Sequence, residues 1–460
     1  MTPVGATLLV ILVLVVLVAP RRWALLGMMA GVLYVPQAQT MDIMGFNMFS
    51  VRFLELAGFI RVLSRREFSF SKLNTIDRAL LLLYGYTAIV YSLRATQGYA
   101  YAIGIAADAC LCYFTFRGLV GGVEDFRRFL RDFVILLTPF VCLVLIESLT
   151  HQDPFVGMMG PLNVEWFREN MVRCRGSFRH PSLLGTLGAS FFPLYLGLAF
   201  TSADRVRACF GVGLSLAIVW ASNSGGPLGM TVAGLIGWMV WVMRTRMRAV
   251  RWGILGFVAL AALLMKAPVW YLLARLSSVT GGDGWHRSYL IDVTVRHYRE
   301  WWIAGMPPEA TIDWFPYYLA STGGADLTNQ FISFALAAGL GAVTLFVYLL
   351  SRGFAGLGRA LATVRSRLGP SRDTEYLLWG LGAVLTAHIT NWFGISYWDQ
   401  MYAVWFMQLA VISNLSDQLC LQGTVPAEAE IASEVDALWP EDERTGEGVS
   451  ARSVYRDEAT

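Results

Sequence analysis

Long apolar segments recur along the whole chain, and they constrain its fold more than any other feature. A membrane-crossing helix takes about 20 predominantly apolar residues. Of the 460 residues, 56% are hydrophobic and only 15% are charged, which is more apolar than a soluble domain of this length requires. Apolar runs bounded by charge fall at about 4–20, 23–42, 45–63, 76–94, 99–117, 133–150, 182–200, 208–222, 227–243, 253–272, 330–350, 377–394 and 401–419. The sequence therefore predicts an all-α integral membrane protein with about 12–13 transmembrane helices.

Two of these runs need separate interpretation. The first is preceded by no basic residue and followed by no small-residue cleavage pattern, so it is expected to be an uncleaved span rather than a signal peptide. The third contains Arg52 and Glu55, three residues apart on one helical face. Either these two pair inside the bundle, or the segment lies at the membrane interface.

Clusters of basic residues set the expected orientation, because short cytoplasmic loops are enriched in lysine and arginine. The clusters at 21–22, 61–72, 127–131, 205–207, 244–251 and 352–372 all fall on one side if every span is real. That side is predicted to be cytoplasmic, with the N-terminus outside. Residues 1–420 then form a polytopic membrane domain. Residues 421–460 form a cytoplasmic tail, predicted to be disordered, with ten acidic residues against three arginines.

Two substantial loops are expected on the opposite, outer side, at about 151–181 and 273–328. The second lies between the tenth and eleventh spans and is long enough for helices of its own. Ser288 to Trp302 is predicted to be one, because it has few breakers and ends in Ala-Gly-Met-Pro-Pro. The paired glycines Gly339, Gly341 and Gly380, Gly382 indicate close helix packing.

Arginines in the first outer loop run against the usual charge bias and indicate a site for an anion, such as a pyrophosphate-linked lipid. Arg175 and Arg179 flank Gly-Ser-Phe, and His180-Pro181 opens the next span. The amides at that helix start favour an anion as well. The alternative is contact with lipid headgroups, or pairing with the acidic residues at 165 and 169.

The second outer loop offers a further set of candidates. Arg287 has no acidic residue one helical turn away except Asp283, whereas Arg296 can join a surface ladder with Asp292 and Glu300. His286 and His297 are each a candidate general base or an interfacial histidine, and they lie about 16 Å apart at the helical rise.

Other residue types add less. Trp301 and the many outer aromatic residues fit a membrane-interface belt, or a groove on which sugar rings stack. The six cysteines show no metal-ligand spacing, and neither a metal nor a cofactor is expected.

Four motifs in succession resemble those of the O-antigen polymerase and O-antigen ligase superfamily of bacterial membrane glycosyltransferases. They are Arg175-Gly-Ser-Phe-Arg-His-Pro181, the turn Ser222 to Gly226, the stretch from His286-Arg287 to Ile303-Ala-Gly305, and Thr328-Asn329-Gln330 before Ala338-Gly339-Leu340-Gly341. Asn223 stands where the family often has arginine. Thr328 stands where the family has a histidine, so His286, His297 or Asp326 would have to replace that base.

The resemblance implies a bacterial inner-membrane enzyme that polymerises repeat units of an exopolysaccharide or O-antigen. Its donor would be a polyprenyl-pyrophosphate-linked oligosaccharide at the periplasmic face, used without metal or nucleotide sugar. Arg175 and Arg287 would then hold the pyrophosphate, with Arg179, His180, Arg296, Asp326, Asn329 and Trp301 binding substrate. Partners would be a glycan acceptor, membrane lipids and other polysaccharide assembly proteins such as a chain-length regulator, but no nucleic acid.

Two alternatives stay open at this stage. One is a ligase that transfers glycan from the same carrier to a lipid or protein acceptor, since the donor chemistry would be identical. The other is a flippase for lipid-linked glycan, which should carry costly charges along a path through the bundle. Charges within the spans are few (Arg52, Glu55, Asp108, Lys266), and this favours an enzyme.

Overall fold

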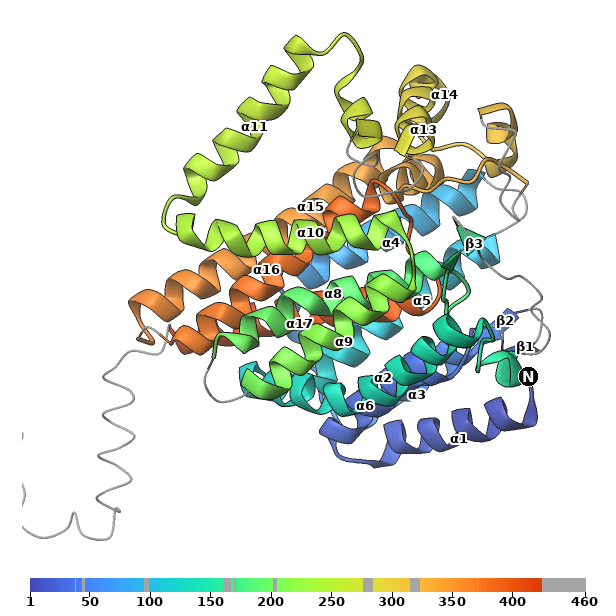
Figure 1. Cartoon of the computed structure of the whole chain (residues 1–460), viewed down its shortest axis with the longest axis vertical. Helices are drawn as coiled ribbons and strands as arrows, with labels where there is room; N and C mark the ends of the chain where they lie inside the picture. The colour runs from blue at the N-terminus through green and yellow to red at the C-terminus, as the bar shows by residue number, and fades with distance from the viewer. Residues whose placement is uncertain are drawn as a thin grey trace, which may run out of the picture.

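The chain is predominantly helical in the computed structural model (Figure 1), which describes residues 1–37, 39–43, 46–94, 99–159, 167–168, 171–201, 205–275, 284–314, 323–369 and 371–423. Each of the thirteen apolar runs overlaps a helix. These helices are α1 (Pro3–Val18), α2 (Arg21–Tyr34), α3 (Ser50–Ser64), α4 (Thr75–Arg94), α5 (Tyr99–Leu119), α6 (Val123–Thr150), α8 (Pro181–Ala199), α9 (Arg205–Ala221), α10 (Gly225–Met239), α11 (Met247–Leu264), α15 (Gln330–Ser366), α16 (Arg372–Trp392) and α17 (Gln400–Gln422).

Seven helices in the described part of the chain are long and apolar enough to cross a membrane, judged by length and composition. They are α4, α5, α6, α8, α10 with its 3-10 extension Val240–Met243, α11 and α15. The other six are shorter or less apolar than these seven, and α1 among them is a short apolar helix. The prediction of a predominantly helical protein is confirmed, and these seven helices have the length and composition of membrane spans.

Two short hairpins depart from the all-α prediction. The run expected at 23–42 ends as a helix at Tyr34, because Pro36 cannot continue it. The chain then forms β1 (Thr40–Ile43) and β2 (Phe46–Phe49), which pair antiparallel. A second pair, β3 (Phe167–Arg168) and β4 (Met171–Val172), follows the short helix α7 (Val156–Met159) in the first of the two predicted loops.

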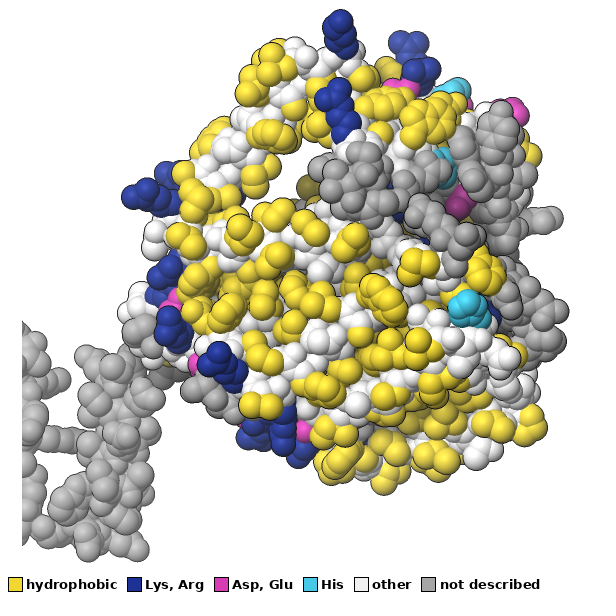
Figure 2. Space-filling model, viewed as in Figure 1, with side chains coloured by type: hydrophobic (Ala, Val, Ile, Leu, Met, Phe, Trp, Pro, Cys, Tyr) yellow, Lys and Arg dark blue, Asp and Glu magenta, His cyan; other side chains and the backbone are white. Residues whose placement is uncertain are grey.

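The centre of the bundle is α8, which packs against α9, α10, α16 and α17. Glycines let these backbones approach closely: a methyl group at Gly188 would lie 2.5 Å from the Ser215 carbonyl oxygen of α9. By contrast, α11 stands away from the bundle in Figure 1, and its side chains are exposed along its length. Apolar side chains cover much of the face that Figure 2 shows.

The two ends of the bundle differ. At the end where α17 finishes, here called the tail end, the basic loops meet: Arg127 lies 3.9 Å from Asp373, and Arg367 donates to the Gly423 carbonyl at 2.6 Å. A cavity of about 500 Å³ opens there, lined by residues from 121–125, 364–374 and 418–422. The opposite end carries stretches 151–180 and 284–314 and is called the loop end. The predicted tail from residue 424 onward lies outside the described residues.

The second outer loop builds a small core of its own at the loop end. The helix expected at 288–302 is observed as α13 (Gly284–Arg296) and α14 (Tyr298–Trp301), separated by a break at His297. The 3-10 helix η4 (Pro308–Trp314) follows. Side chains from these elements and from the start of α15 form one apolar cluster that includes Leu290, Trp301, Trp314 and Ile332.

Gly339 does not serve helix packing as the sequence suggested. It lies at a kink of α15 with φ of +75°, and α15 is non-helical at Ala338 and Gly339. The outer loop pairs with this kink, because Leu340 N–H donates to the Trp302 carbonyl at 2.8 Å and Met306 N–H to the Leu336 carbonyl at 2.9 Å. Gly341 and Gly380 do pack closely on neighbouring helices, against Tyr86 and Pro193 respectively.

Gly339→Ala is therefore expected to undock the outer loop from α15. The new methyl group would lie 2.6 Å from the Ile303 carbonyl oxygen, on a backbone with positive φ that disfavours side chains. We expect a lower melting temperature in detergent and faster proteolysis within 284–314. Gly358→Ala, in the same helix with nothing within 4 Å, is the matched control and should behave like the parent protein. Equal behaviour of the two variants would contradict this role for the kink.

Candidate functional site

The turn Ser222–Gly226 between α9 and α10 receives both arginine-bearing stretches. Arg173 Nη2 lies 3.5 Å from Ser224 Oγ. From the other stretch, Arg287 Nη2 would be 3.7 Å from a methyl group placed on Gly226. The structure thus brings stretches 173–180 and 284–296 to one turn at the loop end.

Local hydrogen bonds explain the shape of this turn. Asn223 has φ of +41°, a conformation that asparagine tolerates better than most residues. The Cys174 N–H donates to the Ala221 carbonyl at 3.0 Å, which holds the first stretch beside the end of α9. Ser224 Oγ bonds Ser182 Oγ at 2.7 Å and does not cap α10. The start of α10 is therefore a helix N-terminus whose dipole favours an anion.

Arg287 is seated against the outer turn between α16 and α17. A methyl group on Gly394 would lie 2.9 Å from the Arg287 Cζ, so only glycine leaves room for the guanidinium. Asn391 lies beside it and is 2% exposed. Its Nδ2 donates to Thr186 Oγ1 at 3.0 Å and to the Tyr397 hydroxyl at 3.3 Å.

The side-chain amide oxygen Oδ1 of Asn391 lies close to the start of α10. It has no hydrogen-bond partner among the described residues and would lie 3.2 Å from a methyl group on Gly226. A buried acceptor left in this way indicates a place for a hydrogen-bond donor, such as a ligand hydroxyl. The site thus combines two guanidinium groups, two serine hydroxyls, a helix N-terminus and one buried amide.

Gly394→Ala is expected to displace Arg287 without removing any functional group. Because the added methyl would clash with Cζ and Nη1 at 2.9 Å, the guanidinium must leave its seat. Activity should fall at least tenfold, while the melting temperature changes little. The control is Gly382→Ala, also in the α16 region, where the nearest atom is Leu357 Cδ1 at 3.9 Å. Parent-like activity in Gly394→Ala would show that the position of Arg287 does not matter.

Arg175 lies deeper than the sequence suggested. Its side chain is 7% exposed and pairs with Asp153, with Nε 3.1 Å from Oδ2. The backbone N–H groups of Arg175 and Gly176 donate to the Glu147 carboxylate at 3.0 and 2.8 Å. Burial raises the pKa of Asp153, while the nearby Arg175 opposes that shift. These contacts fix the fold of the stretch that carries Arg173.

Arg179 and His180 link this stretch to two further elements. Arg179 Nε lies 3.2 Å from Asp399 Oδ2, just before α17, and Nη2 donates to the Gln37 carbonyl at 3.1 Å. His180 Nδ1 accepts the Ser182 N–H at 3.1 Å and so caps α8. Burial lowers the pKa of His180 to about 4, which keeps this acceptor unprotonated at neutral pH.

Three further residues that the sequence pointed to, Arg296, His297 and Trp301, belong to the second loop. Arg296 is 71% exposed and pairs with Asp292 at 2.6 Å, and His297 pairs with Glu300 at 2.7 Å. Both lie on the outer surface of α13 and α14 rather than at the Ser222–Gly226 turn. Trp301 belongs to the loop core, where its indole N–H donates to the Thr294 carbonyl at 2.7 Å.

His286, Asp326 and Asn329 lie nearer the bundle. His286 is buried and lies close to Asp326. Burial raises the pKa of Asp326, and the nearby His286 lowers it. Asn329 caps α15, because its Oδ1 accepts the N–H groups of Phe331 and Ile332 at 2.9 and 3.2 Å.

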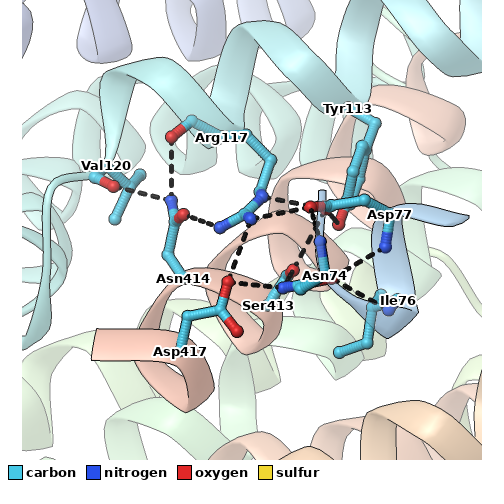
Figure 3. Close-up of polar contacts among 9 residues, drawn as sticks. All are labelled: Asn74, Ile76, Asp77, Tyr113, Arg117, Val120, Ser413, Asn414 and Asp417. Carbon is cyan, nitrogen blue, oxygen red and sulfur yellow. Dashed lines mark hydrogen bonds and ion pairs between the residues drawn. The ribbon is translucent and has the colours of Figure 1, made fainter. Parts of the chain in front are cut away.

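A second polar cluster lies at the tail end, where α4, α5 and α17 meet (Figure 3). Arg117 binds Asp77 through Nε at 3.0 Å and Nη2 at 2.8 Å, and Asp77 also accepts the Tyr113 hydroxyl at 2.6 Å. Asn414 and Asp417 of α17 complete the set around Arg117. Each charged group in it has a protein partner, so we interpret the cluster as a structural polar contact that joins the helices.

Sequence reasoning left several residues of the site without a role. Arg173 was visible in the first stretch, two residues before Arg175, and its position against the charge bias was the available signal. Asn391, Gly394 and Asp399 gave no signal of their own, because their closeness to the arginines comes from helix packing.

The fold and the site together define a bundle of membrane-type helices with a basic, helix-terminal site at its loop end. The chain matches no protein-family model, and a search of the curated proteins finds no relative of it.

Proposed function

We propose that this chain is a membrane glycosyltransferase that uses a polyprenyl-pyrophosphate-linked oligosaccharide as its donor. In this proposal it acts at the periplasmic face of the bacterial inner membrane and polymerises repeat units of an exopolysaccharide or O-antigen. The observation that carries the proposal is the meeting of Arg173 and Arg287 at the N-terminus of α10.

The chemistry of the donor explains why such a site is needed. Negative charge grows on the pyrophosphate as its bond to the sugar breaks, and preorganised cations stabilise that charge most effectively in a water-poor site. Guanidinium groups bind phosphate oxygens in a planar, bidentate manner. The dipole of α10 and the hydroxyls of Ser182 and Ser224 add to the same field.

The residues of the site divide into those that bind the donor and those that position them. Arg173 and Arg287 bind the pyrophosphate, and Asn391 accepts a hydrogen bond from a sugar hydroxyl. Arg175, the residue favoured from the sequence, acts as a positioning residue through Asp153 and Glu147. Asn329 supports the site by capping α15 and by its 3.5 Å contact with the Phe393 carbonyl, beside Gly394.

The acceptor is not determined by these features, so a ligase is the second candidate. A flippase is favoured less, because Arg52 and Asp108, two of the charges within the spans, form an ion pair through two bonds of 2.7 Å. Charges that neutralise each other are less suited to line a transport path than unpaired charges would be.

Glycan analysis of a strain lacking the chain tests the proposal. A polymerase predicts that single repeats accumulate on the carrier outside the cytoplasm, whereas a ligase predicts that polymer accumulates on the carrier. Repeats trapped on the cytoplasmic side would indicate a flippase and would overturn the proposal. An unchanged glycan profile would also overturn it.

A further inference from the structure

A further charged cluster lies at the loop end, before the start of α17, and it has no part in the proposed pyrophosphate site. We call it the Asp399 cluster; it consists of Asp399, Arg179, Arg52, Asp108 and Phe49. Arg52 and Asp108 form a two-bond ion pair at 2.7 Å, and Arg179 lies 3.2 Å from Asp399. Both guanidinium groups lie over the Phe49 ring, 4.6 and 5.5 Å from its centroid.

Asp399 is the unusual member of the cluster. Its backbone has φ of +51° and ψ of −134°, a region that favours glycine, and its side chain is 9% exposed. Such conformations are strained in non-glycine residues and cluster at active sites and ligand-binding sites. The chain thus keeps a carboxylate where glycine would fit the backbone better.

One oxygen of the Asp399 carboxylate is only partly satisfied by its neighbours. Arg52 is engaged by Asp108, so Arg179 is the main cation that balances Asp399, and it also donates to the Gln37 carbonyl. Although Arg179 Nε lies 3.2 Å away, Asp399 Oδ2 has no hydrogen bond of good geometry among the described residues. A buried carboxylate oxygen in this state is available to a hydroxyl group.

Short links connect Asp399 to the proposed pyrophosphate site. Arg179, its ion-pair partner, lies three residues before Ser182, which bonds Ser224 at the start of α10. On the other side, Tyr397 lies two residues before Asp399 and accepts a hydrogen bond from Asn391 at 3.3 Å. The Trp398 ring between them lies 6.5 Å from the His180 ring.

We propose that Asp399 is the proton acceptor for the acceptor hydroxyl, an inference that rests on the proposed function. The acceptor oxygen forms a bond to the anomeric carbon of the donor sugar, and its proton passes to the Asp399 carboxylate. The bond from that carbon to the pyrophosphate oxygen breaks, and its electron pair leaves on the polyprenyl pyrophosphate. Arg179 is a positioning residue that holds the carboxylate.

The ionisation of Asp399 agrees with this role. Burial raises its pKa to about 6, while Arg179, Arg52 and the Gln37 amide lower it and Asp108 raises it. Tyr402 is a further titratable group near Asp399. A base with a pKa of about 6 is ionised at neutral pH and loses activity as the pH falls below 6.

The histidines fit this role less well. His297 is partly exposed and pairs with Glu300, and His286 is buried close to Asp326. Thr328, which stands where the superfamily that the motifs resemble has histidine, has no group that titrates near neutral pH.

The test measures kcat and KM from pH 5 to 9 in membrane vesicles, with lipid-linked repeats extracted from the deletion strain as donor. Asp399→Asn should lower kcat by about 10²- to 10⁴-fold, leave KM for the donor nearly unchanged and remove the ascending limb near pH 6. Asp399→Glu should restore part of the rate together with that limb. An Asp399→Asn profile that keeps the limb overturns the inference and points to a histidine.

Asp399→Gly separates a chemical role from a structural one. Glycine relieves the positive φ, so the melting temperature should hold or rise, and activity should still be lost. Activity retained in Asp399→Gly overturns the inference. Absence of transfer by the parent protein overturns the proposed function instead, so the two failures are distinct.

Discussion

Arg287→Ala is expected to abolish glycan transfer almost completely, with a loss of at least about 10²-fold in kcat. The guanidinium lies near the start of α10, in space that Gly394 leaves open, so its removal leaves the developing pyrophosphate charge without a main cation. Arg173→Ala should act in the same direction, because Arg173 approaches Ser224 from the other side. The measurement is chain extension on lipid-linked repeats in vesicles, normalised to the amount of inserted protein.

A nearby arginine supplies the control. Arg296 lies on the same helix as Arg287 but is 71% exposed and pairs with Asp292. Arg296→Ala should therefore keep most of the activity. Full activity in both Arg287→Ala and Arg173→Ala would rule out the pyrophosphate role.

Arg117→Ala is expected to give the largest loss of stability. Its side chain is 4% exposed and Asp77 is fully buried, so the variant would leave an uncompensated carboxylate inside the bundle (Figure 3). Breaking a buried pair in this way costs about 3–5 kcal/mol. The free energy of unfolding, measured by denaturant titration in detergent micelles, should fall by that order.

Arg22→Ala is the matched control for this second prediction. Arg22 also binds an aspartate closely, with Nε 2.6 Å from Asp132 Oδ2, but its side chain is 55% exposed. Exposed ion pairs contribute little to stability. If the two variants lost equal stability, the buried cluster around Arg117 would not stabilise the bundle more than an exposed ion pair does.

The apolar runs predicted the positions of the helices well, because the same physical requirement sets the apolar sequence and the helical structure of a span. A span must hide its backbone polar groups, so its length and composition are visible in the sequence. The ends were predicted less well: α6 and α15 extend far beyond their apolar runs, as 28- and 37-residue helices. Charged residues such as Glu124 and Arg365 continue these helices at the tail end, where hydropathy gives no signal.

The site could be predicted only in part. Arg287 and the stretch 173–180 were recognisable because arginine is unexpected in outer loops. Whether a given arginine faces a ligand or a carboxylate depends on packing, and so Asp153 beside Arg175 could not be foreseen. The same holds for Asp399, whose importance comes from a backbone conformation and from partners more than 200 residues away in the chain.

Accessibility labelling tests the central claim most directly. In a cysteine-free background, Met171→Cys and Arg296→Cys mark the two stretches, and Ser366→Cys marks the tail end; all three positions are exposed. An impermeant maleimide applied to spheroplasts should label positions 171 and 296 at once, and position 366 only after permeabilisation. Labelling of 171 and 296 from opposite surfaces would contradict a shared extracytoplasmic site and the function built on it.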